Sequence, residues 1–345
     1  RASVQQVYGR ITEDLDEAIT LLTGASARAD KAEISVEVAY GLRARANLLM
    51  GKWAAAASDA AKAYGTSAPY SVADVSQPTF YNATDNAWIW GIVVTTEDYL
   101  AKTGIVNWPS NLCSLTGMGY TTAASATDVA YRLINKNLWA KIPETDVRKG
   151  WWVDEDLHSP VLDNGLGEDY AYYWANGMFN GGTFPSKFSP YTNVKFGPDN
   201  GTFADTDNAQ DWPLMRVEEM KLIEAEALGR DNLATGKQKL EEFVRQYRDP
   251  SYTCTAGSLD AFIDEVWFQR RVELWGEGFA LFDILRLKKP IIRQGANYPI
   301  NSTFAEIAAE APIMIYRIPE AETSVNSAIT EADNNPAAMA PTPVN

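Results

Sequence analysis

The stretch RRVELWGEGFALFDILRLKKP, Arg270–Pro290, carries the most specific pattern in this 345-residue chain. It continues an apolar helical face that begins upstream at Phe262. Within the stretch, oppositely charged residues stand three positions apart, a spacing at which side chains pair along a helix. The pairs that this spacing predicts are Arg270 with Glu273 and Asp283 with Arg286.

Two glycines, Gly276 and Gly278, interrupt the helical pattern. Glycine turns the chain at little cost and lets another segment come close, so we expect a turn between two helices here. The charges are matched within the stretch, as buried charges need to be. We therefore interpret it as a structural hinge and not as an active site.

Helical periodicity dominates the two ends of the chain. Residues 4–22, 34–51 and 52–65 predict three helices, and further helices are expected over 214–230, 235–247 and 259–275. The second and third helices meet at a very short turn around Gly51, and the third is rich in alanine. This hairpin resembles a tetratricopeptide-type unit.

Residues 66–213 have a different composition. They hold most of the tryptophans and many turn sequences, and NAWIWGIVV at 86–94 predicts a short buried strand. A loop region of this length in a globular domain is usually functional. The sequence therefore predicts a mostly α fold of tetratricopeptide-like helix pairs, with long loops and a few short strands.

Several blocks, in order, resemble one known family. The pattern R-R-x-E-L-x-x-E-G-x-x-x-F-D-x-x-R over Arg270–Arg286 is similar to the C-terminal signature of the SusD/RagB-like glycan-binding outer-membrane lipoproteins. Ala280 departs from it, since many members carry a basic residue there. The other blocks that resemble family segments lie at 10–22, 33–64, 211–228 and 314–329.

The resemblance implies a single SusD-like domain over residues 1–345. Its parts would be a helical repeat portion (1–65), a loop-rich ligand-facing region (66–213), a C-terminal helical region (214–331) and a tail (332–345). The chain starts at Arg1 without a signal peptide or a lipid-attachment cysteine. We expect the N-terminal part of the family domain and its lipid anchor to lie outside this chain.

The resemblance also implies a function: non-catalytic capture of glycans at the outer membrane of a Bacteroidetes-type cell. The captured glycan would be imported through a SusC-like TonB-dependent transporter. One alternative is a helical-repeat scaffold that binds only a protein partner. The other is a glycoside hydrolase, whose acid and base would come from the acidic runs at 154–157 and 167–169. Residue spacing does not encode which sugar is bound.

Composition agrees with a glycan ligand. The net charge of −15 argues against nucleic acid and suits a neutral or cationic ligand. The chain has 11 Trp and 16 Tyr against 12 Phe, an excess of aromatics that carry a polar group and work at wet surfaces. The apolar C–H faces of sugar rings stack on such side chains.

Two loop segments supply the candidate glycan-binding residues. In the first, Trp108 is flanked by Asn107 and Asn111, with Tyr120 nearby. Trp108 would stack on a sugar ring while the amides bind its hydroxyls. The alternative is that Trp108 anchors the loop to the core.

The second candidate segment is GEDYAYYWANGMF, 167–179, with Tyr172 and Trp174 as its predicted binding residues. If this segment is extended, Tyr170, Tyr172 and Trp174 share one face. That face is either a ligand platform or a surface packed against the helices.

Other chemistry-bearing residues are few. His158 is the only histidine, which excludes a multi-histidine zinc site, and we interpret it as a solvated loop residue. Cys113 and Cys254 are either free or joined to each other. Residues 197–208 offer oxygen ligands for calcium without EF-hand spacing, so we expect a plain turn and no cofactor.

Overall fold

The computed structural model describes residues 2–99, 101, 111–116, 132–178, 187–298 and 305–337. The chain divides into two compact units. Unit 1 comprises Arg1–Ile134 and Leu138–Glu277, and unit 2 comprises Asn135–Asn137 and Gly278–Asn345. The described residues are mostly helical with short strands, which confirms the predicted fold class.

Unit 1 begins with the three predicted helices, α1 (Val4–Leu22), α2 (Val36–Leu49) and α3 (Trp53–Tyr64). Gly51 turns the chain between α2 and α3 with a φ of 71°, a conformation that favours glycine. Small side chains line the contact between these two helices. The buried alanines of α3 are Ala56, Ala57, Ala60 and Ala63.

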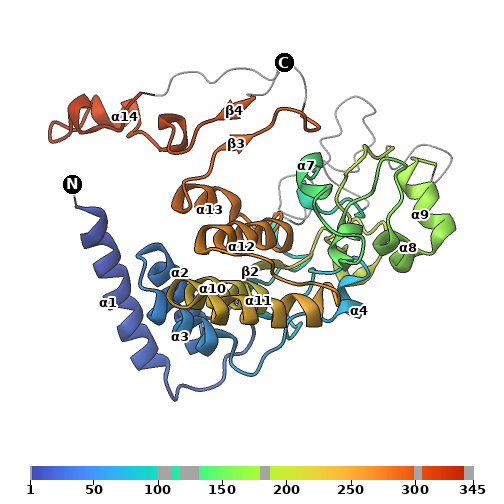
Figure 1. Ribbon diagram of the computed structural model, residues 1–345, viewed down its shortest axis with the longest axis horizontal. Helices are drawn as coiled ribbons and strands as arrows, with labels where there is room; N and C mark the ends of the chain where they lie inside the picture. Colours follow the sequence, from blue (N-terminus) through green and yellow to red (C-terminus); the bar gives the residue numbers. More distant parts are fainter. Residues whose placement is uncertain are drawn as a thin grey trace. The chain divides into compact units, whose positions relative to one another are not determined.

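Helix α10 (Val217–Asp231) lies at the centre of the helical layer and packs against α3, α11 (Leu233–Tyr247) and α12 (Leu259–Glu273) (Figure 1). Two glycines allow this crowding. A Cβ on Gly229 would lie 2.1 Å from the Phe262 ring, and one on Gly236 would lie 2.3 Å from Gly229 Cα. These predicted helices are therefore confirmed, and glycine sets how closely they approach.

The predicted strand is confirmed as β1 (Trp88–Ile92), which pairs antiparallel with β2 (Trp212–Arg216). Trp88 lies opposite Arg216, and Ile92 lies opposite Trp212. Because β2 leads directly into α10, the helix begins at Val217 and not at the predicted residue 214.

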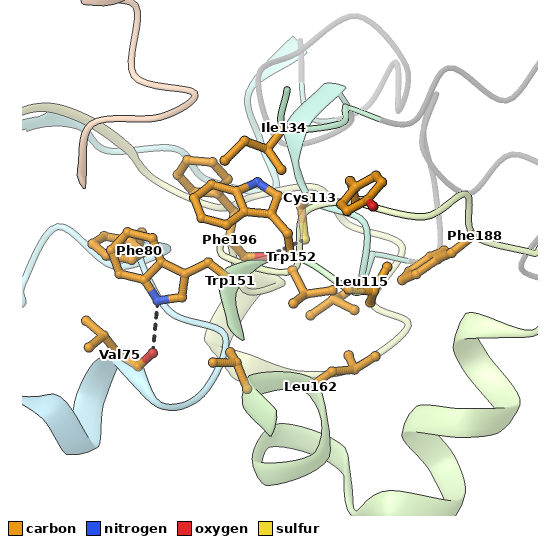
Figure 2. Packing of buried hydrophobic residues seen from close by; sticks show 14 of the residues in the cluster. Val75, Phe80, Cys113, Leu115, Ile134, Trp151, Trp152, Leu162, Phe188 and Phe196 are labelled. Atoms are coloured by element: carbon orange, nitrogen blue, oxygen red, sulfur yellow. Dashed lines mark hydrogen bonds between the residues drawn. The ribbon is translucent and has the colours of Figure 1, made fainter. Parts of the chain in front are cut away.

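The loop-rich part of unit 1 has its own hydrophobic core, shown in Figure 2. Around it lie short elements: α4 (Val72–Val75), η1 (Val147–Trp151), α8 (Pro160–Leu166), α9 (Glu168–Ala175) and η3 (Asp199–Gly201). Trp151 and Trp152 are both buried in this core. Trp151 Nε1 donates to the Val75 carbonyl at 3.0 Å.

Beyond residue 277 the elements are short. They are α13 (Ala280–Arg286), β3 (Ile291–Ile292) paired with β4 (Glu306–Ile307), η4 (Pro312–Met314), α14 (Glu320–Thr323) and η5 (Glu331–Asp333). Helix α7 (Lys136–Trp139) lies earlier in the chain. In α13, Arg286 Nε donates to Asp283 Oδ1 at 2.7 Å, which confirms that predicted pair.

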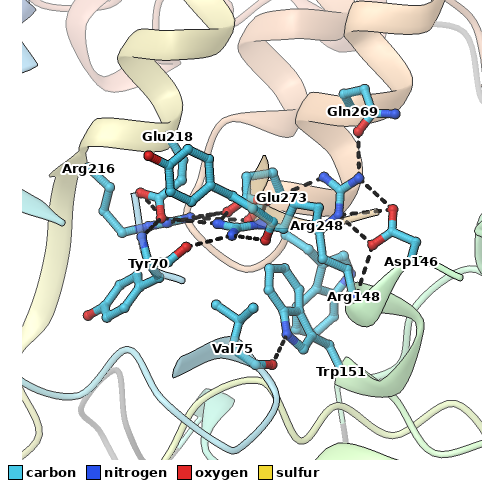
Figure 3. Close-up of polar contacts among 12 residues, drawn as sticks. Tyr70, Val75, Asp146, Arg148, Trp151, Arg216, Glu218, Arg248, Gln269 and Glu273 are labelled. Atoms are coloured by element: carbon cyan, nitrogen blue, oxygen red, sulfur yellow. Dashed lines mark hydrogen bonds and ion pairs between the residues drawn. The ribbon is translucent and has the colours of Figure 1, made fainter. Parts of the chain in front are cut away.

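Glu273, at the end of α12, is fully buried at the centre of a group of arginines (Figure 3). Its carboxylate accepts hydrogen bonds from Arg248 Nε at 2.8 Å and Arg248 Nη2 at 2.9 Å. Arg148 and Arg216 lie 3.3 and 3.4 Å from the same carboxylate. Glu273 is therefore paired with arginines from other segments, and the predicted pairing with Arg270 is replaced by these longer-range contacts.

Further buried charges complete this network. Arg148 also binds Asp146 at 2.6 Å, and Arg216 binds Glu277 at 2.8 Å. The four cations of the network are matched by four carboxylates. They are Arg148, Lys195, Arg216 and Arg248, against Asp146, Glu218, Glu273 and Glu277.

The turn after α12 brings another segment close, as the glycines predict. Gly276 has a φ of 82°, and a Cβ there would lie 2.7 Å from the Phe196 ring. Beside it, Lys195 Nζ donates to the carbonyls of Glu273 and Trp275 and to Glu277 Oε1 at 2.7 to 2.9 Å. The stretch Arg270–Pro290 thus contains a structural turn, as interpreted.

The arginines control the ionisation of Glu273. Burial alone would raise the pKa of this carboxyl, but the charges of Arg248, Arg216 and Arg148 outweigh it and hold the pKa well below its usual value. Because the pKa of Glu273 is lower in the folded state than in the unfolded state, its ionisation stabilises the fold at pH values above the unfolded-state pKa. This stabilisation is lost as the pH falls through the folded-state pKa.

We expect Glu273→Gln to lower the free energy of unfolding by about 3–5 kcal/mol at pH 7, because it leaves buried arginines without their counter-charge. The deficit relative to wild type should shrink as the pH falls below about 4.5, where the unfolded-state carboxyl becomes protonated. Urea denaturation followed by circular dichroism at several pH values measures both effects.

The matched control is Asp14→Asn, which removes an exposed ion pair with Arg10 on α1. It should leave stability almost unchanged, because exposed pairs contribute little. Equal effects of the two substitutions would contradict the structural role of the network.

Candidate functional site

Helix α9 carries the residues of the second predicted segment. Gly167, with a φ of 81°, separates α9 from α8, and Glu168 and Asp169 occupy the first turn of α9, where acidic side chains are favourable. Since the segment is helical, the alternation expected for an extended chain does not apply. Tyr170, Tyr172 and Trp174 therefore do not share one face.

Three tyrosines of α9 are exposed to solvent. Tyr170 and Tyr172 are each 59% exposed and Tyr173 is 47% exposed. The rings of Tyr172 and Tyr173 meet edge to face, with centroids 6.0 Å apart. We call Tyr170, Tyr172 and Tyr173 the tyrosine surface. Exposed aromatics gathered on one short helix are unusual on a protein surface and typically mark a binding site.

Trp174 is the anchor of the same helix. Its side chain is fully buried, its Nε1 donates to the Ser114 carbonyl at 3.1 Å, and its ring contacts Phe203 with centroids 4.2 Å apart. A fully buried ring cannot stack on a sugar, so the predicted contact of Trp174 with a glycan is corrected to a packing role. Burying this large ring, with Ala171 and Ala175 beside it, leaves the tyrosines facing solvent.

Helix α8 connects the tyrosine surface to the buried charge network. Ser159 caps α8 by accepting from the Leu162 amide, and its hydroxyl also donates to the Gly150 carbonyl in η1. A Cβ on Gly150 would lie 2.9 Å from Val161 Cγ2, so glycine is needed for this close contact. Arg148 of η1 binds Glu273. Because α8 is tied to η1, the network thereby fixes the position of α8, and α9 follows α8 directly in the chain.

The other predicted site residues have different outcomes. Asn107, Trp108 and Tyr120 lie outside the described residues. Asn111 is half-buried, and its Oδ1 accepts from Arg132 Nη2 at 3.0 Å. Of the predicted residues that the structure describes, Tyr172 alone is both aromatic and exposed.

The residues that the sequence prediction omitted from this site are Tyr170 and Tyr173. A helical interpretation of 168–175 would have found them, because they stand three positions apart and so lie on one face of a helix. The acidic residues of the first turn and the preceding glycine are the signals for that helix.

Two of the acidic residues weighed for catalysis have structural partners. Asp154 Oδ1 accepts from the amides of Asp156 and His158, both at 2.9 Å, and closes a turn. Glu155 accepts from the Tyr191 hydroxyl at 2.7 Å. Cys113 and Cys254 are both buried and are not joined to each other by a disulfide.

Two features are absent from the residues that the structure describes. Within 2–99, 101, 111–116, 132–178, 187–298 and 305–337, no group of three or more His, Cys, Asp or Glu side chains is placed to hold a metal ion. Across the same part of the chain, every helix is too short or too polar to cross a membrane.

One family profile matches the chain. The sequence matches the profile of the SusD family over residues 135–336, which is more than half of the chain. A comparison with curated protein sequences finds no significant match.

Several solved structures share the fold. A SusD-like carbohydrate binding protein from Bacteroides vulgatus superposes with a TM-score of 0.70 at 20% identity. The superposition covers 97% of this chain and 67% of the Bacteroides vulgatus chain. A SusD superfamily protein from Bacteroides thetaiotaomicron gives 0.68 at 20% identity, with 98% and 67% covered. Another from Bacteroides vulgatus gives 0.68 at 23% identity, with 99% and 67% covered. The chain thus spans about two thirds of the length of each.

We expect Trp174→Ala and Tyr172→Ala to have different effects on stability, because Trp174 is buried in the core and Tyr172 is exposed. Trp174→Ala should lower the free energy of unfolding by about 3–5 kcal/mol, because it opens a large cavity in the core. Tyr172→Ala should change it by no more than about 0.5 kcal/mol, as is usual for surface substitutions. Thermal and urea unfolding measure both, and a strongly destabilised Tyr172→Ala would contradict the exposure of that ring.

Proposed function

Because the chain belongs to the SusD family, we propose that it is a non-catalytic glycan-binding protein. The observation that carries this proposal is the tyrosine surface, three exposed tyrosines on one helix whose tryptophan is buried as an anchor.

The chemistry of the tyrosine surface fits a sugar. A pyranose ring has an apolar C–H face and a rim of hydroxyls. A tyrosine offers a flat apolar ring for that face and a phenolic hydroxyl for the rim. Removing these apolar surfaces from water supplies the binding free energy, and each ring contributes about 1–3 kcal/mol.

The charge of the chain favours an uncharged glycan. Its net charge is −15, and Glu168 and Asp169 lie in the same helix as the tyrosines. Acidic polysaccharides are repelled by such a surface, whereas neutral ones are not. We therefore infer a neutral polysaccharide as the ligand class.

The family also supports a cellular role. We propose that the protein works at the outer surface of the cell, held by a lipid anchor at the outer membrane. There it passes glycans to a SusC-like TonB-dependent transporter. Copurification of the two proteins from outer membranes, after solubilisation in mild detergent, tests this partnership.

Affinity electrophoresis through gels that contain single neutral polysaccharides tests the proposed function. Retardation by at least one neutral glucan, xylan or mannan supports it, and normal migration in all of them contradicts it. Incubation with the retarding polysaccharide should release no reducing sugar. Such release would instead support the glycoside hydrolase alternative.

The double substitution Tyr172→Ala/Tyr173→Ala should weaken binding of the retarding polysaccharide by about thirtyfold or more, since two rings contribute about 2–6 kcal/mol together and each 1.4 kcal/mol is about tenfold. Tyr99→Ala is the matched control, because Tyr99 is 79% exposed and lies outside α9. Affinity electrophoresis over a range of polysaccharide concentrations gives the dissociation constants. Equal weakening by the control, or none by the double variant, would move the binding site away from α9.

A further inference from the structure

A cavity of about 720 Å³ opens in unit 1 between α4, η1, α8 and the chain around Pro250. Its volume lies in the range of small-molecule sites. Residues from α4 and α8 line it, but no described residue of α9 does. The cavity is therefore separate from the tyrosine surface. Helix α8 lines the cavity and is followed directly by α9, which carries the tyrosine surface.

Most charged side chains of the cavity wall have side-chain partners, and Asp154 has backbone ones. Lys149 binds Glu144, and His158 Nε2 lies 2.6 Å from Asp163 Oδ2. Asp154 accepts two backbone amides. The two charges deepest in the wall belong to the buried network, where Asp146 binds Arg148 and Arg248 binds Glu273. Asp154 has no Lys or Arg partner among the described residues, so its negative charge disfavours an acidic ligand on this wall.

The wall also offers aromatic and polar groups together. Trp139 is half-buried, with its Nε1 donating to the Lys149 carbonyl at 3.2 Å. Trp152 is 1% exposed, and its indole N–H has no acceptor among the described residues. That N–H is buried away from solvent, so contacts to a ligand fall to the exposed groups of the wall. Asn164 and His158 add exposed polar groups at the wall.

We propose that this cavity is a second ligand site, which binds a short, neutral, hydroxyl-rich oligosaccharide. The volume admits a small molecule, the unpaired carboxylate of Asp154 selects against acids, and the half-buried indole of Trp139 and the exposed amide of Asn164 suit a sugar. The ligand class rests on the proposed glycan-binding function, whereas the position of the site rests on the cavity alone. The protein would thus hold a polysaccharide at the tyrosine surface and a short oligosaccharide in the cavity.

His158 provides a native probe of this site, because it is the only histidine in the chain. The full chain, labelled with ¹³C at histidine Cε1, gives one imidazole signal in a ¹H–¹³C NMR spectrum. Maltotriose, cellotriose, xylotriose and mannotriose are added up to about 10 mM, where a site with a Kd of about 1 mM is nearly saturated. Trigalacturonate, at the same concentrations and pH, is the acidic comparison.

We expect at least one neutral trisaccharide to shift the His158 signal saturably and trigalacturonate to leave it in place. Asn164→Trp, at an exposed position of the cavity wall, should weaken that trisaccharide at least tenfold by filling the cavity. Glu168→Trp places the same side chain on α9, outside the cavity, and should leave the affinity unchanged. The variant Tyr172→Ala/Tyr173→Ala should also retain the shift.

The proposal is overturned if no neutral trisaccharide moves the His158 signal, or if Asn164→Trp and Glu168→Trp behave alike. A shift caused by trigalacturonate alone would overturn the neutral ligand class. These failures are distinct from failure of the proposed function. If the His158 signal does not shift but polysaccharides still retard the protein, only the cavity site is contradicted. If polysaccharides do not retard the protein but the His158 signal shifts saturably, only the tyrosine surface is contradicted.

Discussion

The buried carboxylate of Glu273 and its arginines constrain the rest of unit 1. Removing a charge from water costs several kcal/mol unless it is paired and hydrogen-bonded, so the arginines have to converge on this point. They arrive from η1, from the end of β2 and from the end of α11. Meeting this demand fixes three distant parts of the chain against the end of α12.

The loops of unit 1 gain their order from that fixed point. Arg148 holds η1, and the next residues place Trp151 and Trp152 in the core between the short helices (Figures 2 and 3). The hydroxyl of Ser159 then ties α8 to η1. A loop-rich region has few backbone ladders of its own, so a rigid base is what lets it present aromatic side chains in a defined arrangement.

The two candidate sites differ in what shapes them. At the tyrosine surface, the burial of Trp174 turns one side of α9 inward and leaves the tyrosines in solvent. In the cavity, most charges are paired and Asp154 is not, which leaves a polar, slightly acidic wall. Both arrangements suit uncharged, hydroxyl-rich molecules, in a protein whose net charge of −15 already disfavours acidic ones.

Sequence alone determined the six long helices α1, α2, α3, α10, α11 and α12, the short strand β1, the turn at Gly276 and the Asp283–Arg286 pair, because periodicity, glycine and three-residue spacing are local properties. The partners of Glu273, the burial of Trp174 and the cavity depend on the tertiary structure. An arginine 125 residues from its carboxylate leaves no local trace in the sequence. Whether an aromatic ring lies in the core or in solvent depends on which neighbours the fold brings to it.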